Sequence, residues 1–193
     1  MNYLAHLFLA QPNPDSHTGN LLGDFCRGID TTVFSDRILA GLRNHRMVDK
    51  YTDTHPVIRQ AKQQFRHSQR RFAGIALDVL FDHYLIVHWS EYSQTDFDQF
   101  CQQAYAKLAQ RLAIMPPRMQ QVIGSMVEHQ WLSQYQSLDG VARALDAIAK
   151  RIRFTNQFAG SIKDIEQNYI EFEQCFNQFF PTLIQHVDQY GPE

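Results

Sequence analysis

The sequence predicts an all-α protein, and three observations carry this prediction. Strict alternation of apolar and polar residues is nearly absent, whereas apolar residues recur at spacings of three and four along the whole chain. Prolines and glycines interrupt this pattern in the manner of helices joined by short loops. No internal repeat, low-complexity tract or linker is visible, so we expect one helical bundle, a single domain over residues 1–193.

The breaks in the pattern outline the helices of the N-terminal half. The opening MNYLAHLFLA predicts a short core helix, which PNPD at positions 12–15 ends. Ser35 can cap the next helix, and Pro56 suits the first turn of another that runs to Phe72. The stretch Ile75 to Trp89 is apolar on nearly all sides, as expected of a helix buried within a bundle.

The C-terminal half continues in the same way. Pro116 ends a helix built on an apolar stripe between Phe97 and Leu108, and the proline that follows can open one that extends to Trp131. Ser161 with Asp164 resembles a capping box. It would begin a helix whose apolar stripe, Ile165, Tyr169, Phe172, Phe176 and Phe179, we interpret as core packing.

The composition excludes several classes of protein. Hydrophobic residues make up 44% of the chain, which is enough for one sizeable core. Charged residues make up 20% and the net charge is −2, so we expect neither a disordered chain nor a nucleic-acid-binding protein. Cys26, Cys101 and Cys175 have no metal-ligand spacing and are odd in number, which favours a reducing compartment. No run is long and apolar enough for a membrane span, so we expect a cytoplasmic protein without membrane contact.

One predicted helix face begins apolar and ends ionisable. Its members, spaced by four, three, four and three, are Ile38, Leu42, His45, Asp49 and Thr52. If Ile38 and Leu42 point into the core, His45 and Asp49 point inward as well, at the i,i+4 spacing that brings two side chains together.

The buried helix from Ile75 to Trp89 contains three further ionisable residues. Asp78 and Asp82 form a second i,i+4 pair, and His83 lies about 100° around the helix from Asp82. Desolvation of an unpaired carboxylate costs several kcal/mol, on the order of the net stability of a small domain. These acids therefore need a cation or strong hydrogen-bond donors nearby. Asp24, in the apolar turn GNLLGDFCRG, supplies a third helical source of ligands.

These acids and histidines predict a metal or catalytic centre. Oxygen and imidazole donors without thiolates favour manganese, magnesium or iron over a structural zinc ion. For any single position the alternative is a hydrogen-bonded residue of the core, and both interpretations stay open residue by residue. The absence of a Glu-x-x-His spacing argues against a ferritin-like di-iron bundle.

Five segments of the sequence resemble one bacterial enzyme family. They are MNYLAHLFLA, GNLLGDFCRG, GLRNHRMVDKYTD, ALDVLFDHYLIVHW and EHQWLSQY. Together they resemble the acyl carrier protein phosphodiesterases, also called acyl carrier protein hydrolases, over almost the whole chain. The resemblance implies hydrolysis of the phosphodiester between a carrier-protein serine and 4'-phosphopantetheine, with manganese as the preferred ion. It also implies a helical fold distantly similar to HD-type phosphohydrolases, although no contiguous His-Asp pair occurs.

Residue roles follow from this chemistry as a hypothesis. The expected metal ligands are Asp24, His45, Asp82 and His83. Asp49 or Asp78 is expected to orient the attacking water. Arg27 and Arg46 are expected to bind the phosphate. His6 is the candidate for protonating the leaving serine oxygen, with a hydrogen bond in the core as its alternative.

A row of basic residues is the expected contact with the acidic carrier protein. Arg59, Lys62, Arg66 and Arg70 fall on one side of the predicted helix from Pro56 to Phe72. They would form an exposed basic ridge, and the alternative is a solvated helix face without a partner. Two other functions remain: an HD-type hydrolase acting on nucleotides, and a non-catalytic helical module that binds an acidic partner.

Overall fold

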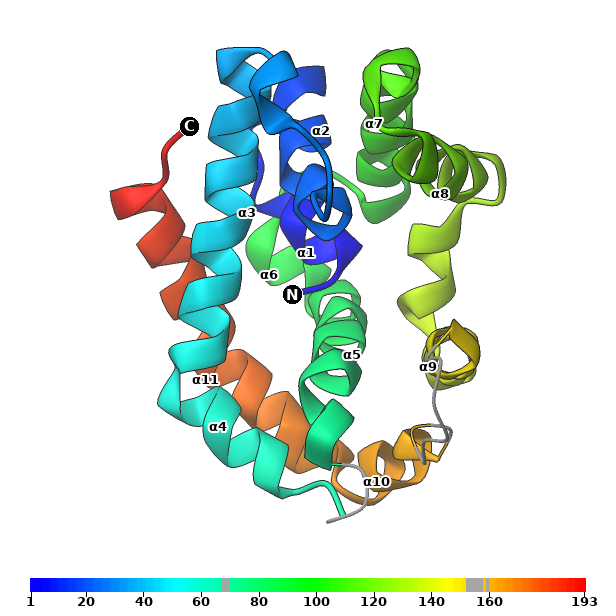
Figure 1. Ribbon diagram of the computed structural model, residues 1–193. Coiled ribbons are helices and arrows are strands. Elements are labelled where there is room, and N and C mark those ends of the chain that lie inside the picture. The colour runs from blue at the N-terminus through cyan, green and yellow to red at the C-terminus, as the bar shows by residue number, and fades with distance from the viewer. Residues whose placement is uncertain (67–69, 152–157, 159) are drawn as a thin grey trace.

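The computed structural model describes residues 1–66, 70–151, 158 and 160–193, and every regular element in these ranges is helical (Figure 1). The all-α class predicted from the sequence is therefore confirmed. The α-helices are α1 (Tyr3–Phe8), α2 (Pro14–Leu22), α3 (Asp36–Thr54), α4 (Pro56–Gln63), α5 (Ala73–Val87), α6 (Trp89–Tyr92), α7 (Phe97–Ala109), α8 (Pro117–Glu128), α9 (Leu138–Arg151), α10 (Ser161–Gln167) and α11 (Tyr169–Tyr190). The 3₁₀ segments are η1 (Gly23–Phe25), η2 (Thr31–Val33), η3 (Arg70–Phe72), η4 (Leu112–Ile114) and η5 (Trp131–Gln136).

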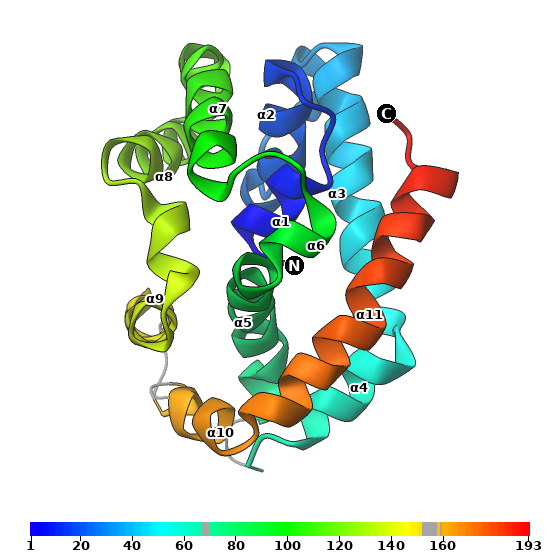
Figure 2. The same ribbon diagram turned by 180° about the vertical axis from the view of Figure 1, so that it is seen from behind.

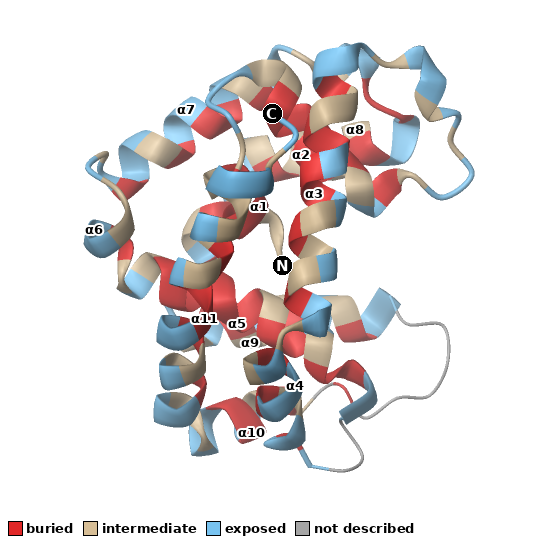
Figure 3. Ribbon diagram, turned by 90° about the vertical axis from the view of Figure 1, so that its left-hand side faces the viewer, coloured by how far each residue is buried: buried red, intermediate tan, exposed pale blue. Residues whose placement is uncertain are grey.

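Helices α1 and α5 form the interior of the bundle. Figures 1 and 2 show α1 enclosed by α2, α3 and α5, with α11 running diagonally behind α5. Figure 3 shows buried residues along α5 and on the inward faces of its neighbours. The aromatic stripe of α11 is core, as predicted, because Phe172, Phe176 and Phe179 are all fully buried. A single hydrophobic cluster joins residues from α1 to α11.

Helix α1 begins where a carboxylate from another helix receives its free N–H groups. Its N-cap residue, Asn2, makes no side-chain cap within the helix. Asp82 of α5 instead accepts from the N–H of Leu4 and of Ala5, each at 2.9 Å, and from the side-chain amide of Asn2 at 2.9 Å. A negative charge at this end of a helix also meets its positive dipole end. The fully buried Asp82 therefore fixes α1 onto α5.

Helices α2 and α3 pack with their backbones in contact. A Cβ atom added to Gly19 would overlap the carbonyl of Ile38 and the Cα of Gly41. Helix α2 was not predicted from the sequence, although Asn13 and Pro14 provide a standard start: the Asn13 side chain accepts from the N–H of Ser16, and Pro14 takes the first helical position. The glycines then place the end of α2 directly beside α3.

Three predicted helix boundaries are wrong. The helix expected over Pro56 to Phe72 ends at Gln63, and the backbone N–H of Arg66 donates to Asp164 at 3.1 Å instead of to a helical carbonyl. The helix expected to run from Ser161 to Phe179 begins at Ser161 but ends at Gln167, and α11 begins at Tyr169. Its predicted capping box is absent, because Asp164 binds Arg66 and Ser161 donates to Phe158. Helix α8 stops before Trp131, since Gln130 adopts a left-handed conformation with φ of 50°.

The predicted starts at Ser35, Pro56 and Pro117 are confirmed. Ser35 accepts from the N–H of Ile38 at 3.4 Å, and the two prolines occupy first turns of α4 and α8. Within the described ranges, no helix has the length and apolar character needed to cross a lipid bilayer. The three cysteines are free thiols.

The cap supplied by Asp82 leads to the first testable prediction. Asp82→Ala leaves the N–H groups of Leu4 and Ala5 buried without an acceptor, so we expect the free energy of unfolding to fall by about 3 kcal/mol. Asp146→Ala, at an exposed position of α9, is the matched control and should change it by less than about 0.5 kcal/mol. Urea denaturation measures both values. Equal stability of the two variants would contradict the assignment of Asp82 as the cap of α1.

Candidate metal and catalytic site

Helix α3 presents His45 and Asp49 on its inward face, at the i,i+4 spacing used in the prediction. Nε2 of His45 lies 3.0 Å from Oδ2 of Asp49. Nδ1 of His45 lies 2.7 Å from the backbone carbonyl oxygen of Asn20 on α2. Because a carbonyl oxygen can only accept, Nδ1 carries a hydrogen and donates. In the neutral ring, Nε2 therefore directs a lone pair toward the carboxylate of Asp49.

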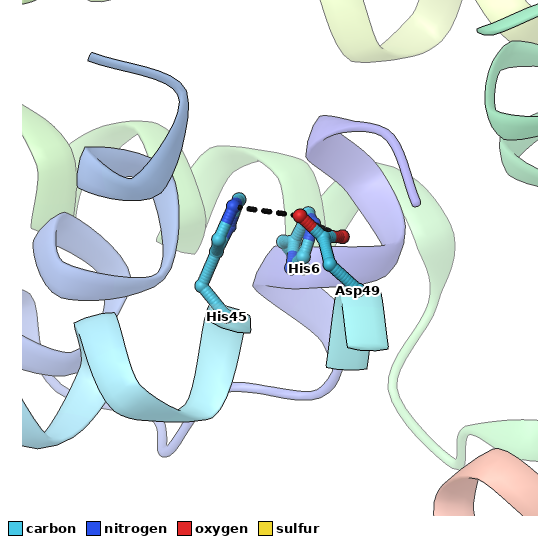
Figure 4. Close-up of side chains that lie close together, drawn as sticks. All are labelled: His6, His45 and Asp49. Atoms are coloured by element: carbon cyan, nitrogen blue, oxygen red, sulfur yellow. Dashed lines mark ion pairs between the residues drawn. The ribbon is translucent and has the colours of Figure 1, made fainter. Parts of the chain in front are cut away.

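His6 of α1 lies against this pair (Figure 4). Its ring stacks on that of His45 with centroids 4.0 Å apart, and its Nε2 lies 3.2 Å from Oδ1 of Asp49. Both ring nitrogens of His6 are buried and make no well-aligned hydrogen bond with the described residues. Burial lowers the pKa of His6 to about 3, although Asp49 opposes the shift. A neutral ring with unsatisfied nitrogens suits a cation ligand better than a proton donor.

The electrostatics of the pair on α3 favour opposite charges. Desolvation opposes ionisation of Asp49, but the adjacent rings of His45 and His6 and the Met1 ammonium group outweigh it and hold the pKa of this carboxyl far below its usual range. Desolvation likewise lowers the pKa of His45, but Asp49 and Asp24 outweigh it and the pKa is raised. A positive charge between Asp49 and His45, either a proton or a metal ion, is therefore favourable.

The three side chains fit a divalent cation. One ligand atom from each of His6, His45 and Asp49 lies within 4.8 Å of the others. Ligands about 2.1 Å from an ion and at right angles to each other are about 3 Å apart, close to the 3.0 and 3.2 Å separations found here. The hydrogen bond from His45 to a backbone carbonyl is the outer contact that orients most metal-binding histidines. Two imidazoles and a carboxylate suit manganese, magnesium or iron.

Two further acids, Asp24 and Asp78, flank this trio. The N-terminal ammonium group of Met1 lies 3.2 Å from Oδ1 of both Asp49 and Asp78, so these carboxylates share one positive charge. Desolvation raises the pKa of Asp78. Asp24 is an exposed residue, but its carboxyl is partly desolvated by the protein around it. This desolvation raises the pKa of the carboxyl, and the charges of Asp49 and Asp78 add to the rise, while His45 opposes it.

Comparison with known proteins identifies the family of the chain. The family described as acyl carrier protein phosphodiesterase matches residues 1–183. The chain belongs to the acyl carrier protein phosphodiesterase family. The resemblance noted in the sequence is therefore confirmed.

Three relatives named acyl carrier protein phosphodiesterase illustrate the similarity. The protein of Pectobacterium atrosepticum is 39% identical over 186 residues, which cover 96% of each chain. That of Serratia proteamaculans is 38% identical over 188 residues, or 97% of each chain. That of Photorhabdus laumondii is 36% identical over 189 residues, which cover 97% of this chain and 96% of the relative. No solved structure matches, so the likeness to the HD-type fold stays a prediction.

The structure brings together five of the acids and histidines predicted for the site: His6, Asp24, His45, Asp49 and Asp78. It places the other two differently. The oxygens of Asp82 face the start of α1, and burial raises the pKa of this carboxyl to about 7 although three donors oppose the rise. Nδ1 of His83 donates to the carbonyl of Tyr135 at 2.7 Å, and its Nε2 lies 2.9 Å from the Tyr169 hydroxyl. Both side chains connect helices, and their expected role as ligands finds no support here.

The basic residues predicted to bind phosphate are exposed. Arg27 and Arg46 form no ion pair with a described carboxylate. Desolvation raises the pKa of the Cys26 thiol, and the charge of Arg46 opposes this rise. Both remain available for an anion. Their role as phosphate ligands stays a prediction.

The predicted basic ridge is only partly present. Lys62 pairs with Asp53 at 3.1 Å, and Arg66 pairs with the buried Asp164 at 2.6 Å. Arg70 lies in η3 rather than on α4, and its guanidinium donates to two backbone carbonyls. Arg59 is exposed and has no ion pair with a described residue. The ridge thus offers one fully available charge.

Sequence reasoning missed two features that hold the site in place. The carbonyl of Asn20 fixes the tautomer of His45, and only the helix packing reveals this contact. Gly23 lies directly under the His45 ring: a Cβ added there would overlap the imidazole. The motif GNLLGDF contains both residues, and its two glycines four positions apart were the available signal for close packing against another helix.

Gly23 provides a second testable prediction. Its φ of −52° and ψ of −40° are helical, so Gly23→Ala strains no backbone and acts only through the His45 ring. We expect overpacking to cost about 1–3 kcal/mol of unfolding free energy and to shift the His45 ring resonances in NMR spectra. Gly124→Ala, where the nearest atom to the new Cβ is 3.9 Å away, should instead stabilise the protein by about 0.5–1 kcal/mol. Unchanged His45 resonances in Gly23→Ala would contradict the close contact.

Proposed function

We propose that this protein hydrolyses the phosphodiester bond between 4'-phosphopantetheine and the serine of holo acyl carrier protein. The products are apo carrier protein and free 4'-phosphopantetheine. The observation that carries the proposal is the convergence of two imidazole nitrogens and an ionised carboxylate at His6, His45 and Asp49, in a chain of this family. The acidic carrier protein is the partner, and a cytoplasmic location is the expected one.

We propose that His6, His45 and Asp49 hold a divalent ion, most readily Mn²⁺, with Mg²⁺ or Fe²⁺ as alternatives. A divalent ion there supplies positive charge for the non-bridging phosphate oxygens and makes water a stronger nucleophile at neutral pH. The chain contributes geometry. In the neutral ring, the Asn20 carbonyl holds the hydrogen of His45 on Nδ1 and leaves Nε2 as the free ligand atom. Burial keeps bulk water away from the stacked rings of His6 and His45.

The two flanking acids are placed for proton transfer. Asp78, half-buried on α5, can accept the proton of the attacking water. Asp24 lies on the solvent side, and its raised pKa lets it carry a proton to the serine oxygen as the bond from phosphorus to that oxygen breaks. Arg27 and Arg46, both exposed beside the cluster in sequence, are proposed to neutralise the phosphate.

The third prediction separates metal ligands from proton carriers. His45→Ala and Asp49→Ala should weaken Mn²⁺ binding, measured by calorimetry, by more than about 100-fold and remove release of phosphopantetheine, measured by mass spectrometry of holo carrier protein. Asp24→Asn and Asp78→Asn should retain the ion but lower kcat by roughly 10²–10⁴-fold.

Asp36→Ala is the matched control for these variants, because Asp36 is an exposed acid at the start of the same helix, α3. It should bind Mn²⁺ and release phosphopantetheine as the wild type does. Full Mn²⁺ affinity in both His45→Ala and Asp49→Ala would refute the metal assignment. Hydrolysis of nucleotides with no action on holo carrier protein would favour the nucleotide hydrolase, and binding without hydrolysis the non-catalytic module.

The fourth prediction concerns carrier-protein docking. Arg59→Glu should raise KM for holo carrier protein roughly fivefold at low ionic strength and less at high salt, because a charge at the rim of an interface acts mainly on encounter. Hydrolysis of a small phosphodiester should not change. Arg37→Glu, an exposed substitution at the opposite end of α3, is the control. If both variants keep the wild-type KM in low salt, α4 does not contact the carrier protein.

A further inference from the structure

A pocket of about 310 Å³ opens beside the start of α1, between η5 and α9. The side chains that define it are Tyr3, Trp131, Tyr135, Ala147, Arg143 and Arg151. Its volume is at the lower end of the range of small-molecule sites. It shares no lining residue with the trio of His6, His45 and Asp49, so it forms a separate compartment.

The lining has two chemical parts. Trp131, Tyr135 and the small side chain of Ala147 provide an aromatic and aliphatic wall. Arg143 and Arg151, both exposed on α9, add positive charge, and neither has an ion pair with a described carboxylate. A wall of this kind suits a slender chain of methylene, methyl and amide groups that carries an anion at one end.

The pocket and the proposed metal site are linked by the first residues of the chain. Tyr3 lines the pocket, while the Met1 ammonium contacts Asp49 at 3.2 Å. Because two residues of chain span at most about 7 Å, the Cα atoms of Met1 and Tyr3 lie within that distance of each other. Residues of both sites influence the pKa of the Tyr3 hydroxyl. Burial raises this pKa to about 12, Asp24 beside the metal site adds to the rise, and Arg151 of the pocket opposes it.

We propose that this pocket binds the pantetheine arm of the substrate, with the aliphatic body of the arm on Trp131 and Ala147 and its phosphate end at Tyr3 and Arg151. The inference rests on the proposed function, because that function supplies the arm. The occupant is a single extended chain rather than a helix of the carrier protein, since a pocket of about 310 Å³ holds only a small molecule. The arm thus enters beside α1 and delivers its phosphodiester to the cluster.

A binding experiment tests the pocket without any reaction. Trp131 is partly exposed in the pocket, whereas the other tryptophan, Trp89, is buried. Titration of the metal-free wild type with 4'-phosphopantetheine should change tryptophan fluorescence saturably, and Trp131→Phe should abolish the change. Ala147→Phe fills the pocket and should weaken binding at least tenfold. Ala106→Phe, the same change at an exposed helical alanine of α7, should leave binding at the wild-type level.

A second probe divides the pocket into its two parts. Arg143→Gln with Arg151→Gln should weaken 4'-phosphopantetheine but leave pantetheine, which lacks the phosphate, unchanged. Equal binding of 4'-phosphopantetheine by Ala147→Phe and by the wild type would overturn the inference, as would binding that leaves Trp131 fluorescence unaltered. Fluorescence quenching by apo carrier protein but not by 4'-phosphopantetheine would also overturn it and assign the surface to the protein partner.

The kinetic measurement keeps the two proposals distinguishable. With Mn²⁺ present, Ala147→Phe should raise KM for holo carrier protein at least tenfold and leave hydrolysis of bis(p-nitrophenyl) phosphate unchanged. If the wild type releases phosphopantetheine and Ala147→Phe keeps the wild-type KM, the pocket inference alone is removed. If the wild type fails to release phosphopantetheine, the proposed function is refuted. The fluorescence titration then still decides whether the pocket binds 4'-phosphopantetheine.

Discussion

The approach of α2 to α3 is the constraint on which the site depends. Gly19 and Gly23 lie four positions apart on the side of α2 and η1 that faces α3, and a Cβ on either would overlap α3 or the His45 ring. Without those atoms, the carbonyl of Asn20 comes within 2.7 Å of Nδ1 of His45. That hydrogen bond decides which nitrogen of His45 faces Asp49. Small side chains in one helix therefore determine the chemistry of an imidazole in the next.

The second constraint is how the buried acids near the start of α1 obtain hydrogen-bond donors and positive charge. Asp82 has three, two of them backbone N–H groups, and is satisfied by the fold itself. Asp49 faces two imidazoles, while Asp24 and Asp78 have raised pKa values. Removing several acids from water is costly unless positive charge accompanies them. A cation bound at this cluster would thus stabilise the folded protein as well as serve the reaction.

The sequence predicted this site where helical spacing alone was enough. His45 and Asp49 continue the apolar face that begins at Ile38 and Leu42, and the structure places them together as that spacing requires. Asp82 and His83 gave the same signal, ionisable residues in an apolar helix, for a different reason. Their partners are backbone groups of Leu4, Ala5 and Tyr135 and the hydroxyl of Tyr169, which lie between 52 and 86 positions away along the chain. Spacing within one helix carries no information about such partners.

The same limit explains the errors in the helix boundaries. Ser161 and Asp164 have the spacing of a capping box, and Arg66 lies within an apparently continuous helical pattern. A single long-range contact changes both, because Asp164 accepts from the backbone N–H of Arg66 at 3.1 Å and pairs with its guanidinium at 2.6 Å. The contact also neutralises a charge that the helical-wheel argument counted as part of an exposed ridge. Local patterns therefore overestimate both helix length and surface charge wherever a buried acid lies nearby.

This neutralisation changes how an acidic partner would be attracted. Charges on exposed surfaces act over about 10 Å at moderate salt, so a cation influences the phosphate only if it lies near the cluster. In the proposed complex, Arg59 on α4 would lie at the periphery of the docked carrier protein and would act on the rate of encounter. Arg143 and Arg151 line the pocket next to Tyr3, so in the same proposal they would act on the arm itself. Recognition of the protein and recognition of its prosthetic group would then fall to different helices, and substitutions on α4 and α9 should affect different steps.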